Sequence, residues 1–83
     1  MTHTIVNRQN AQHYLWGEAC DGWRLLDSEA LAIIEERMPS GTREVLHLHN
    51  RAEQFFYVLQ GEALFTIDGE KLRLGESSGL HPW

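Results

Sequence analysis

The stretch that decides this sequence runs from His47 to Glu62 and reads HLHNRAEQFFYVLQGE. Two histidines flank one leucine, and side chains two positions apart on a β-strand point to the same side. His47 and His49 are therefore placed to bind one ion. Neutral imidazoles combined with oxygen ligands suit Fe, Mn, Ni, Cu or Zn. The pair predicts a divalent transition-metal site, and the alternative is two polar residues on a solvent-facing strand.

The oxygen ligand has two candidates, Glu53 and Gln54, which open the next expected strand at residues 54–60. If Phe56 and Val58 face the interior, alternation makes Gln54 the inward ligand. Glu53 then shares the other side with further apolar residues, namely Phe55, Tyr57 and Leu59. Apolar residues on both sides predict a central strand that is covered on both faces.

The rest of the chain also indicates short strands joined by tight turns. Asp68-Gly69 between 63–67 and 70–74 is a strong hairpin signal. Residues 30–38 fit either a helical face or a strand, and the Pro39-Ser40-Gly41 turn follows them. This pattern predicts an all-β sandwich or barrel. We divide the chain into an N-terminal arm, 1–28, which contains Trp16 and Trp23, and a core, 29–83.

Composition excludes several classes of function. The chain has 83 residues, of which 42% are hydrophobic and 23% charged, and its net charge is −5. The basic residues are scattered, which argues against nucleic acid and anionic membranes as partners. Cys20 is the single cysteine and the N-terminus lacks the pattern of a signal peptide, so we expect a reducing, cytoplasmic location.

The segment from Gly41 to Gly61 resembles the first motif of the cupins: a glycine, five residues, HxH, three or four residues, a glutamate, six residues and a glycine. The resemblance covers roughly residues 30–80. It implies a cupin-type antiparallel β-barrel of jelly-roll type, with a metal inside it. It also implies that 30–38 is a strand, because cupins have a strand before the turn.

Two departures from the family's pattern affect the site. Six residues before Gly61 lies Gln54, where cupins usually have a metal-binding glutamate, and Glu53 lies one position early. The segment from Gly75 to Pro82 resembles the opening of the second motif, whose later histidine is not reached. The resemblance therefore implies a barrel that is incomplete at the C-terminus. His81 is a candidate substitute ligand, and the alternative is an ordinary loop residue.

Cupins include enzymes, storage proteins and binding domains, so the fold leaves the function open. The leading hypothesis is a small metal-binding cupin that holds a small polar molecule, as an oxygenase or isomerase. The rivals are a non-enzymatic or metal-free binding module and a protein that acts through an oligomer interface. The expected ligands are His47, His49 and Gln54, with Glu53 as the alternative. Unpaired strand edges also predict a homodimer.

Overall fold

The computed structural model describes residues 3–43 and 53–82. Within these ranges it has seven β-strands and no helix, which confirms the all-β prediction. The described part accordingly has no helix that could span a membrane. The chain forms two compact units, residues 1–46 and 47–83. The predicted boundary at 28/29 falls inside the first unit, and the division into arm and core stays a prediction.

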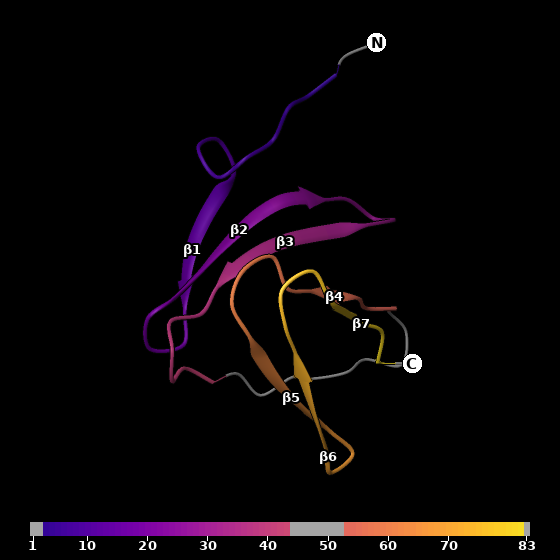
Figure 1. The fold of residues 1–83 in the computed structure, drawn as a ribbon. Helices are drawn as coiled ribbons and strands as arrows, with labels where there is room; N and C mark the ends of the chain where they lie inside the picture. The colour runs from indigo at the N-terminus through magenta and orange to yellow at the C-terminus, as the bar shows by residue number, and fades with distance from the viewer. Residues whose placement is uncertain (1–2, 44–52, 83) are drawn as a thin grey trace. The chain divides into compact units, whose positions relative to one another are not determined.

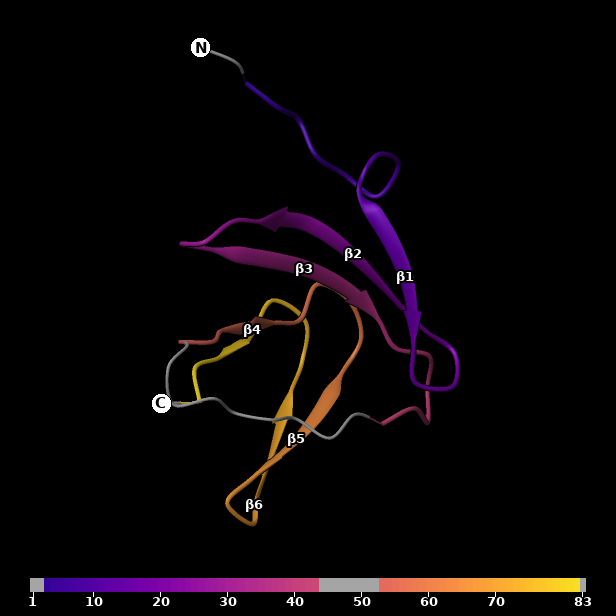
Figure 2. The ribbon, with the colours of Figure 1, turned by 180° about the vertical axis from the view of Figure 1, so that it is seen from behind.

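The first unit is a three-stranded antiparallel sheet in the order β1-β2-β3. It consists of β1 (Gln12–Trp16), β2 (Cys20–Asp27) and β3 (Ala32–Arg37). Figures 1 and 2 show these strands side by side as one curved sheet. The strand predicted over 30–38 is thereby confirmed. Gly17 turns the chain between β1 and β2 at a φ of +60°, a conformation that glycine adopts without strain.

One face of this sheet carries a row of side chains that cross all three strands. His13 pairs with Trp23, and Trp23 pairs with Glu35. The rings of His13 and Trp23 have centroids 5.3 Å apart. The Arg8 guanidinium lies 4.1 Å from the centre of the Trp23 ring and contacts the Glu35 carboxylate. Cation–π and ion-pair contacts therefore connect the segment before β1 to β3.

The neighbouring row of the same face centres on Asp21. His13 Nε2 lies 2.7 Å from Asp21 Oδ1, and Arg37 Nη1 donates a hydrogen bond of 3.2 Å to Oδ2. The hydrogen bond with His13 is the main cause that lowers the pKa of Asp21 below its usual value. Desolvation acts in the opposite direction, and Arg37 adds to the lowering.

This lowered pKa predicts a pH-dependent stability. The ionised Asp21 stabilises the folded state above its unfolded pKa of about 3.9, and this contribution is lost as pH falls through the lower folded value. Asp21→Asn should therefore reduce the urea midpoint of unfolding near neutral pH, and the difference should shrink in acid. Asp27→Asn, at the exposed end of the same strand, is the control. A deficit in Asp21→Asn that is the same at all pH values would contradict this origin.

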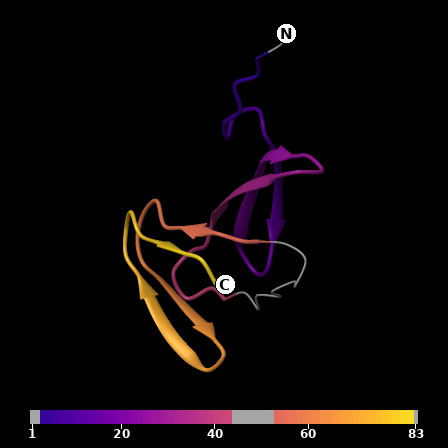
Figure 3. The ribbon, with the colours of Figure 1, turned by 90° about the vertical axis from the view of Figure 1, so that its right-hand side faces the viewer.

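The second unit contains two strand pairs. β5 (Ala63–Ile67) and β6 (Glu70–Leu74) form a hairpin, and β4 (Phe56–Tyr57) pairs with β7 (Gly79–Leu80). Figure 3 shows the hairpin extending away from the β4–β7 pair. Asp68 and Gly69 both have positive φ, 50° and 79°, as a two-residue type I′ turn requires. The predicted hairpin is confirmed.

The apolar core of this unit is built by alternation. The inner face of the hairpin is half-buried or buried, and it consists of Ala63, Phe65, Ile67, Leu72 and Leu74. The rings of Phe56 and Phe65 have centroids 5.3 Å apart, so β4 contributes to the same core. Tilted aromatic pairs at this separation add about 0.5–1.5 kcal/mol beyond the area they bury.

The prediction that the strand near Phe56 is covered on both faces is wrong for the described residues. The side opposite Phe56 remains exposed: Phe55 at 65%, Tyr57 at 52% and Leu59 at 68%. The sequence pattern shows which side chains are apolar, but it does not show whether another part of the protein covers them. The described strands form three separate sheets, so the barrel is not closed among them.

Candidate functional site

The two glycines that bound the predicted motif occupy turns that need them. Gly41 has a φ of +86° and Gly61 has a φ of +87°, in the left-handed region that other residues rarely adopt. The turn that contains Gly41 is closed by a hydrogen bond of 3.1 Å from the Thr42 amide to the Pro39 carbonyl. The Gly61 amide donates to Glu76 Oε1 at 3.0 Å. Both ends of the motif are therefore fixed by backbone geometry.

Gln54 lies on the inner side of the segment that leads into β4. Its side chain is half-buried, as are Phe56 and Val58 two and four positions later. The Oε1 atom of Gln54 is buried and has no hydrogen-bond partner among the described residues. An amide oxygen in this state is rare, because buried polar groups are almost always paired. The buried Oε1 of Gln54 thus belongs to the side chain that lies on the same side as Phe56 and Val58.

Glu53 lies on the outer side, with its side chain 77% exposed. Its Oε1 is 2.9 Å from His81 Nε2, and the His81 side chain is 46% exposed. The alternation predicted from the sequence, with Glu53 and Gln54 on opposite sides, is therefore present. The pair of Glu53 and His81 was not predicted, because it depends on how residues far apart in the sequence are aligned.

The loop that precedes β7 is tied to the end of β4 by the backbone. The Val58 amide donates to the Ser78 carbonyl at 3.0 Å, and the Ser77 amide donates to the Val58 carbonyl at 2.8 Å. Ser77 adopts a φ of 60° to make this turn. These bonds align the segment that resembles the second motif with the end of the first motif, which brings His81 beside Glu53.

The two histidines of the motif, His47 and His49, lie outside the described residues. Within residues 3–43 and 53–82, no three His, Cys, Asp or Glu side chains are grouped so as to hold a metal ion. Of the four predicted ligand residues, Gln54 and its alternative Glu53 lie within the described residues.

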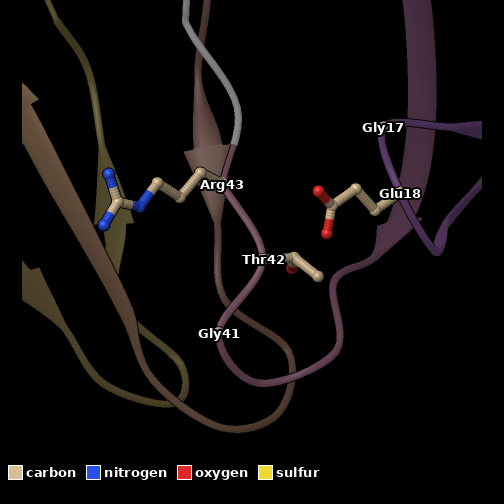
Figure 4. Close-up of a pocket in the computed structure, with 5 residues that line it drawn as sticks. All are labelled: Gly17, Glu18, Gly41, Thr42 and Arg43. Carbon is tan, nitrogen blue, oxygen red and sulfur yellow. The ribbon is translucent and has the colours of Figure 1, made fainter.

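A separate hollow of about 290 Å³ lies in the first unit. It is lined by Gly17, Glu18, Gly41, Thr42 and Arg43. Figure 4 shows the Glu18 carboxylate and Thr42 turned toward the same space, whereas the Arg43 side chain points away from it. Thr42 Oγ1 donates to the Pro39 carbonyl at 2.6 Å. The hollow contains none of the predicted ligands. Among its lining residues only Gly41 belongs to the predicted motif, so the sequence did not predict this hollow.

An all-β chain with HxH spacing between two turn glycines and an inward amide oxygen defines a class of small barrel-type domains. The family model described as Cupin domain matches residues 34–80, which is more than half of the chain. The chain belongs to the cupin family.

One curated relative is an uncharacterized protein of Methanocaldococcus jannaschii, 30% identical over 50 residues. The match covers 60% of this chain and 40% of the relative, so the chain spans well under half of that protein's length. No solved structure matches the chain.

Proposed function

We propose that this chain is a small cupin domain that binds a divalent transition metal through His47, His49 and Gln54. The observation that supports it most is the buried Oε1 of Gln54, which lacks a partner among the described residues. Leaving a buried polar atom unpaired costs about 1–3 kcal/mol, and a cation beside the oxygen would remove that cost. Glu53 is the alternative ligand, and its exposure and its pairing with His81 favour Gln54.

The proposed ligand of the domain is a small polar molecule. A bound metal would supply Lewis acidity or redox chemistry, and the enzymatic candidates are an oxygenase and an isomerase. The chain's own contribution would be an apolar wall that excludes water. Phe56 and Val58 lie on the same side as Gln54, and the Phe65 ring centroid is 5.3 Å from that of Phe56. Pockets of this kind bind mostly through apolar walls and orient the ligand by a few polar groups.

The second candidate is a non-enzymatic binding module, with or without a metal. Among the described residues, the face that carries Gln54, Phe56 and Val58 has no side chain able to transfer a proton. Glu53 and Tyr57 belong to the opposite, exposed side. General acid–base catalysis requires such a group within reach of the substrate. This observation favours binding over catalysis.

Metal content after dialysis tests the proposal. The chain should retain about one divalent ion per molecule, and His47→Ala and His49→Ala should each lose most of it, because every ligand adds to the binding free energy. Equal, negligible metal in all three proteins would reject the metal site and leave the metal-free module. His3→Ala is the matched control, since it removes an exposed histidine outside the motif.

We also propose a cytoplasmic homodimer. The free thiol of Cys20 is buried, which suits a reducing compartment. Phe55, Tyr57 and Leu59 form an exposed apolar stripe that a second copy would cover. Two such stripes contribute about 700 Å² if each of their six side chains exposes somewhat over 100 Å², roughly half of a standard interface.

Light scattering over a dilution series should show a dimer, and Tyr57→Ser should weaken it. Leu64→Ser, which changes an exposed leucine on β5, should leave the dimer intact. A monomer at every concentration would contradict the homodimer, and equal effects of both variants would contradict the assignment to this stripe.

A further inference from the structure

The backbone pairing between β4 and β7 does not extend to Gln54. Among residues 53–82, only Phe56 and Tyr57 pair with β7, opposite Leu80 and Gly79. After Tyr57, the backbone hydrogen bonds of Val58 with Ser77 and Ser78 continue this pairing. Before Phe56, residues 53–55 lie outside the paired strand, but their burial alternates as in an extended chain, with Glu53 and Phe55 exposed and Gln54 half-buried. Backbone pairing to β7 therefore does not fix which way the Gln54 side chain points.

Two side-chain contacts hold this segment instead, and both lie on its outer side. Glu53 pairs with His81 at 2.9 Å. The Phe55 ring packs against Gly79 so closely that a Cβ there would lie 2.3 Å from the ring's Cζ atom. Gly79 and His81 are two residues apart and share one face of the extended chain. Glu53 and Phe55, the outer side chains of residues 53–55, thus both contact the face of the β7 segment that carries Gly79 and His81.

These contacts determine the orientation of the residue between them. Successive side chains of an extended chain point to opposite sides, so holding Glu53 and Phe55 outward directs Gln54 inward. Without that constraint, an amide whose buried oxygen has no partner among the described residues would gain by rotating toward water, because an unsatisfied buried acceptor costs free energy. The inward orientation therefore needs a contact that opposes this rotation.

We propose that His81 is a positioning residue, which holds Gln54 toward the interior through its pair with Glu53. The effect on metal affinity rests on the proposed function, whereas the effect on Gln54 itself does not. An exposed contact between two polar side chains contributes little to global stability, so its loss should change the local orientation of Gln54 far more than the free energy of unfolding. His81 then acts from outside the site, in place of the ligand role considered from the sequence.

The first experiment uses metal-free, ¹⁵N-labelled protein. The side-chain amide signal of Gln54 is assigned by its absence in Gln54→Glu, and its exchange with solvent is measured. His81→Ala should accelerate this exchange by at least about tenfold as the side chain moves to water. Glu53→Ala removes the other partner of the same contact and should accelerate the exchange to a similar extent. His81→Gln, whose amide can still donate to Glu53, should restore slow exchange.

The matched control is Arg73→Ala. It removes an exposed ion pair of the same unit, Arg73 with Glu62 at 3.6 Å, without touching residues 53–55. Exchange at Gln54 should remain as in the unmodified chain. Unchanged exchange in both His81→Ala and Glu53→Ala would overturn the proposal, and so would an equal acceleration in Arg73→Ala. The backbone amide spectrum tests whether each variant is folded, and Glu53→Ala keeps the test valid if His81→Ala unfolds.

The second experiment is a cobalt(II) titration of the same proteins. His81→Ala should weaken cobalt binding by about 10–100-fold, the usual effect of losing a group that orients a metal ligand. Arg73→Ala should bind as the unmodified chain does. Altered Gln54 exchange in His81→Ala, together with no cobalt binding by the unmodified chain, would support the positioning role and reject the metal site. Altered exchange with unchanged cobalt affinity would reject Gln54 as the ligand.

Discussion

Replacing Gln54 with glutamate should raise the affinity of the chain for a divalent metal by at least about tenfold, which corresponds to about 1.4 kcal/mol. The inward amide oxygen is neutral, whereas a carboxylate at the same place would also compensate the charge of the cation. Gln54→Ala should lower the affinity, because it removes the oxygen. Both changes are measured by competition with a chromophoric chelator.

The neighbouring residue provides the control for that prediction. Glu53→Gln retains an acceptor for His81 but removes a charge from the outer side, so metal affinity should change much less than in Gln54→Glu. If Glu53→Gln instead lost the metal as fully as His47→Ala, Glu53 would be the ligand. The assignment of inner and outer sides would then be wrong.

Gly22→Ala should destabilise the first unit by about 1–3 kcal/mol, the usual cost of forcing an extra group into a packed position. Gly22 is buried in β2 and faces Tyr14 of β1 in register. A Cβ there would lie 2.3 Å from the Tyr14 Cζ atom, so the ring must move. Its displacement also disturbs the Arg24 guanidinium, which lies 4.7 Å from the ring centre.

Thermal unfolding measures this effect, since 1 kcal/mol shifts the midpoint by about 4–8 °C in a domain of this size. Gly75→Ala is the matched control, because a Cβ at Gly75 meets no atom of the described residues within 4 Å. A midpoint for Gly22→Ala equal to that of Gly75→Ala would show that the contact between Tyr14 and Gly22 does not contribute to stability.

The elements that the sequence predicted well are those governed by short-range chemistry. The Asp68-Gly69 turn requires positive φ at two adjacent residues, and few dipeptides provide it. The strand at Ala32–Arg37 was ambiguous because nearly all of its residues are exposed, so periodicity carried little information. The family resemblance was needed to decide between helix and strand.

The strands β1 and β2 were not predicted individually. Their pairing places polar residues such as His13, Asp21 and Arg24 within strands, and these obscure an apolar alternation. The ion pairs that accommodate these residues connect positions distant in sequence, for example Arg37 with Asp21. Such contacts depend on the register between strands, which local patterns do not determine.

In the candidate site, too, the features set by neighbouring residues were predicted, and the contacts between distant residues were not. Strand alternation alone predicted that Glu53 and Gln54 face opposite sides. The pairing of Glu53 with His81 depends on the register of β4 against β7, and a single sequence does not contain that register. The apolar outer side of Phe55 and Tyr57 was predicted, but its exposure was not, because burial depends on what covers it.

The most direct test of the central claim places a paramagnetic ion at the site. In ¹⁵N-labelled protein, substoichiometric Mn²⁺ should broaden the side-chain amide signal of Gln54 beyond detection, because the amide would lie beside the ion. The same addition to a His47→Ala, His49→Ala double variant should leave that signal sharp. A Gln54 signal that stays sharp in the unmodified chain while Mn²⁺ is bound would contradict Gln54 as the metal's oxygen ligand.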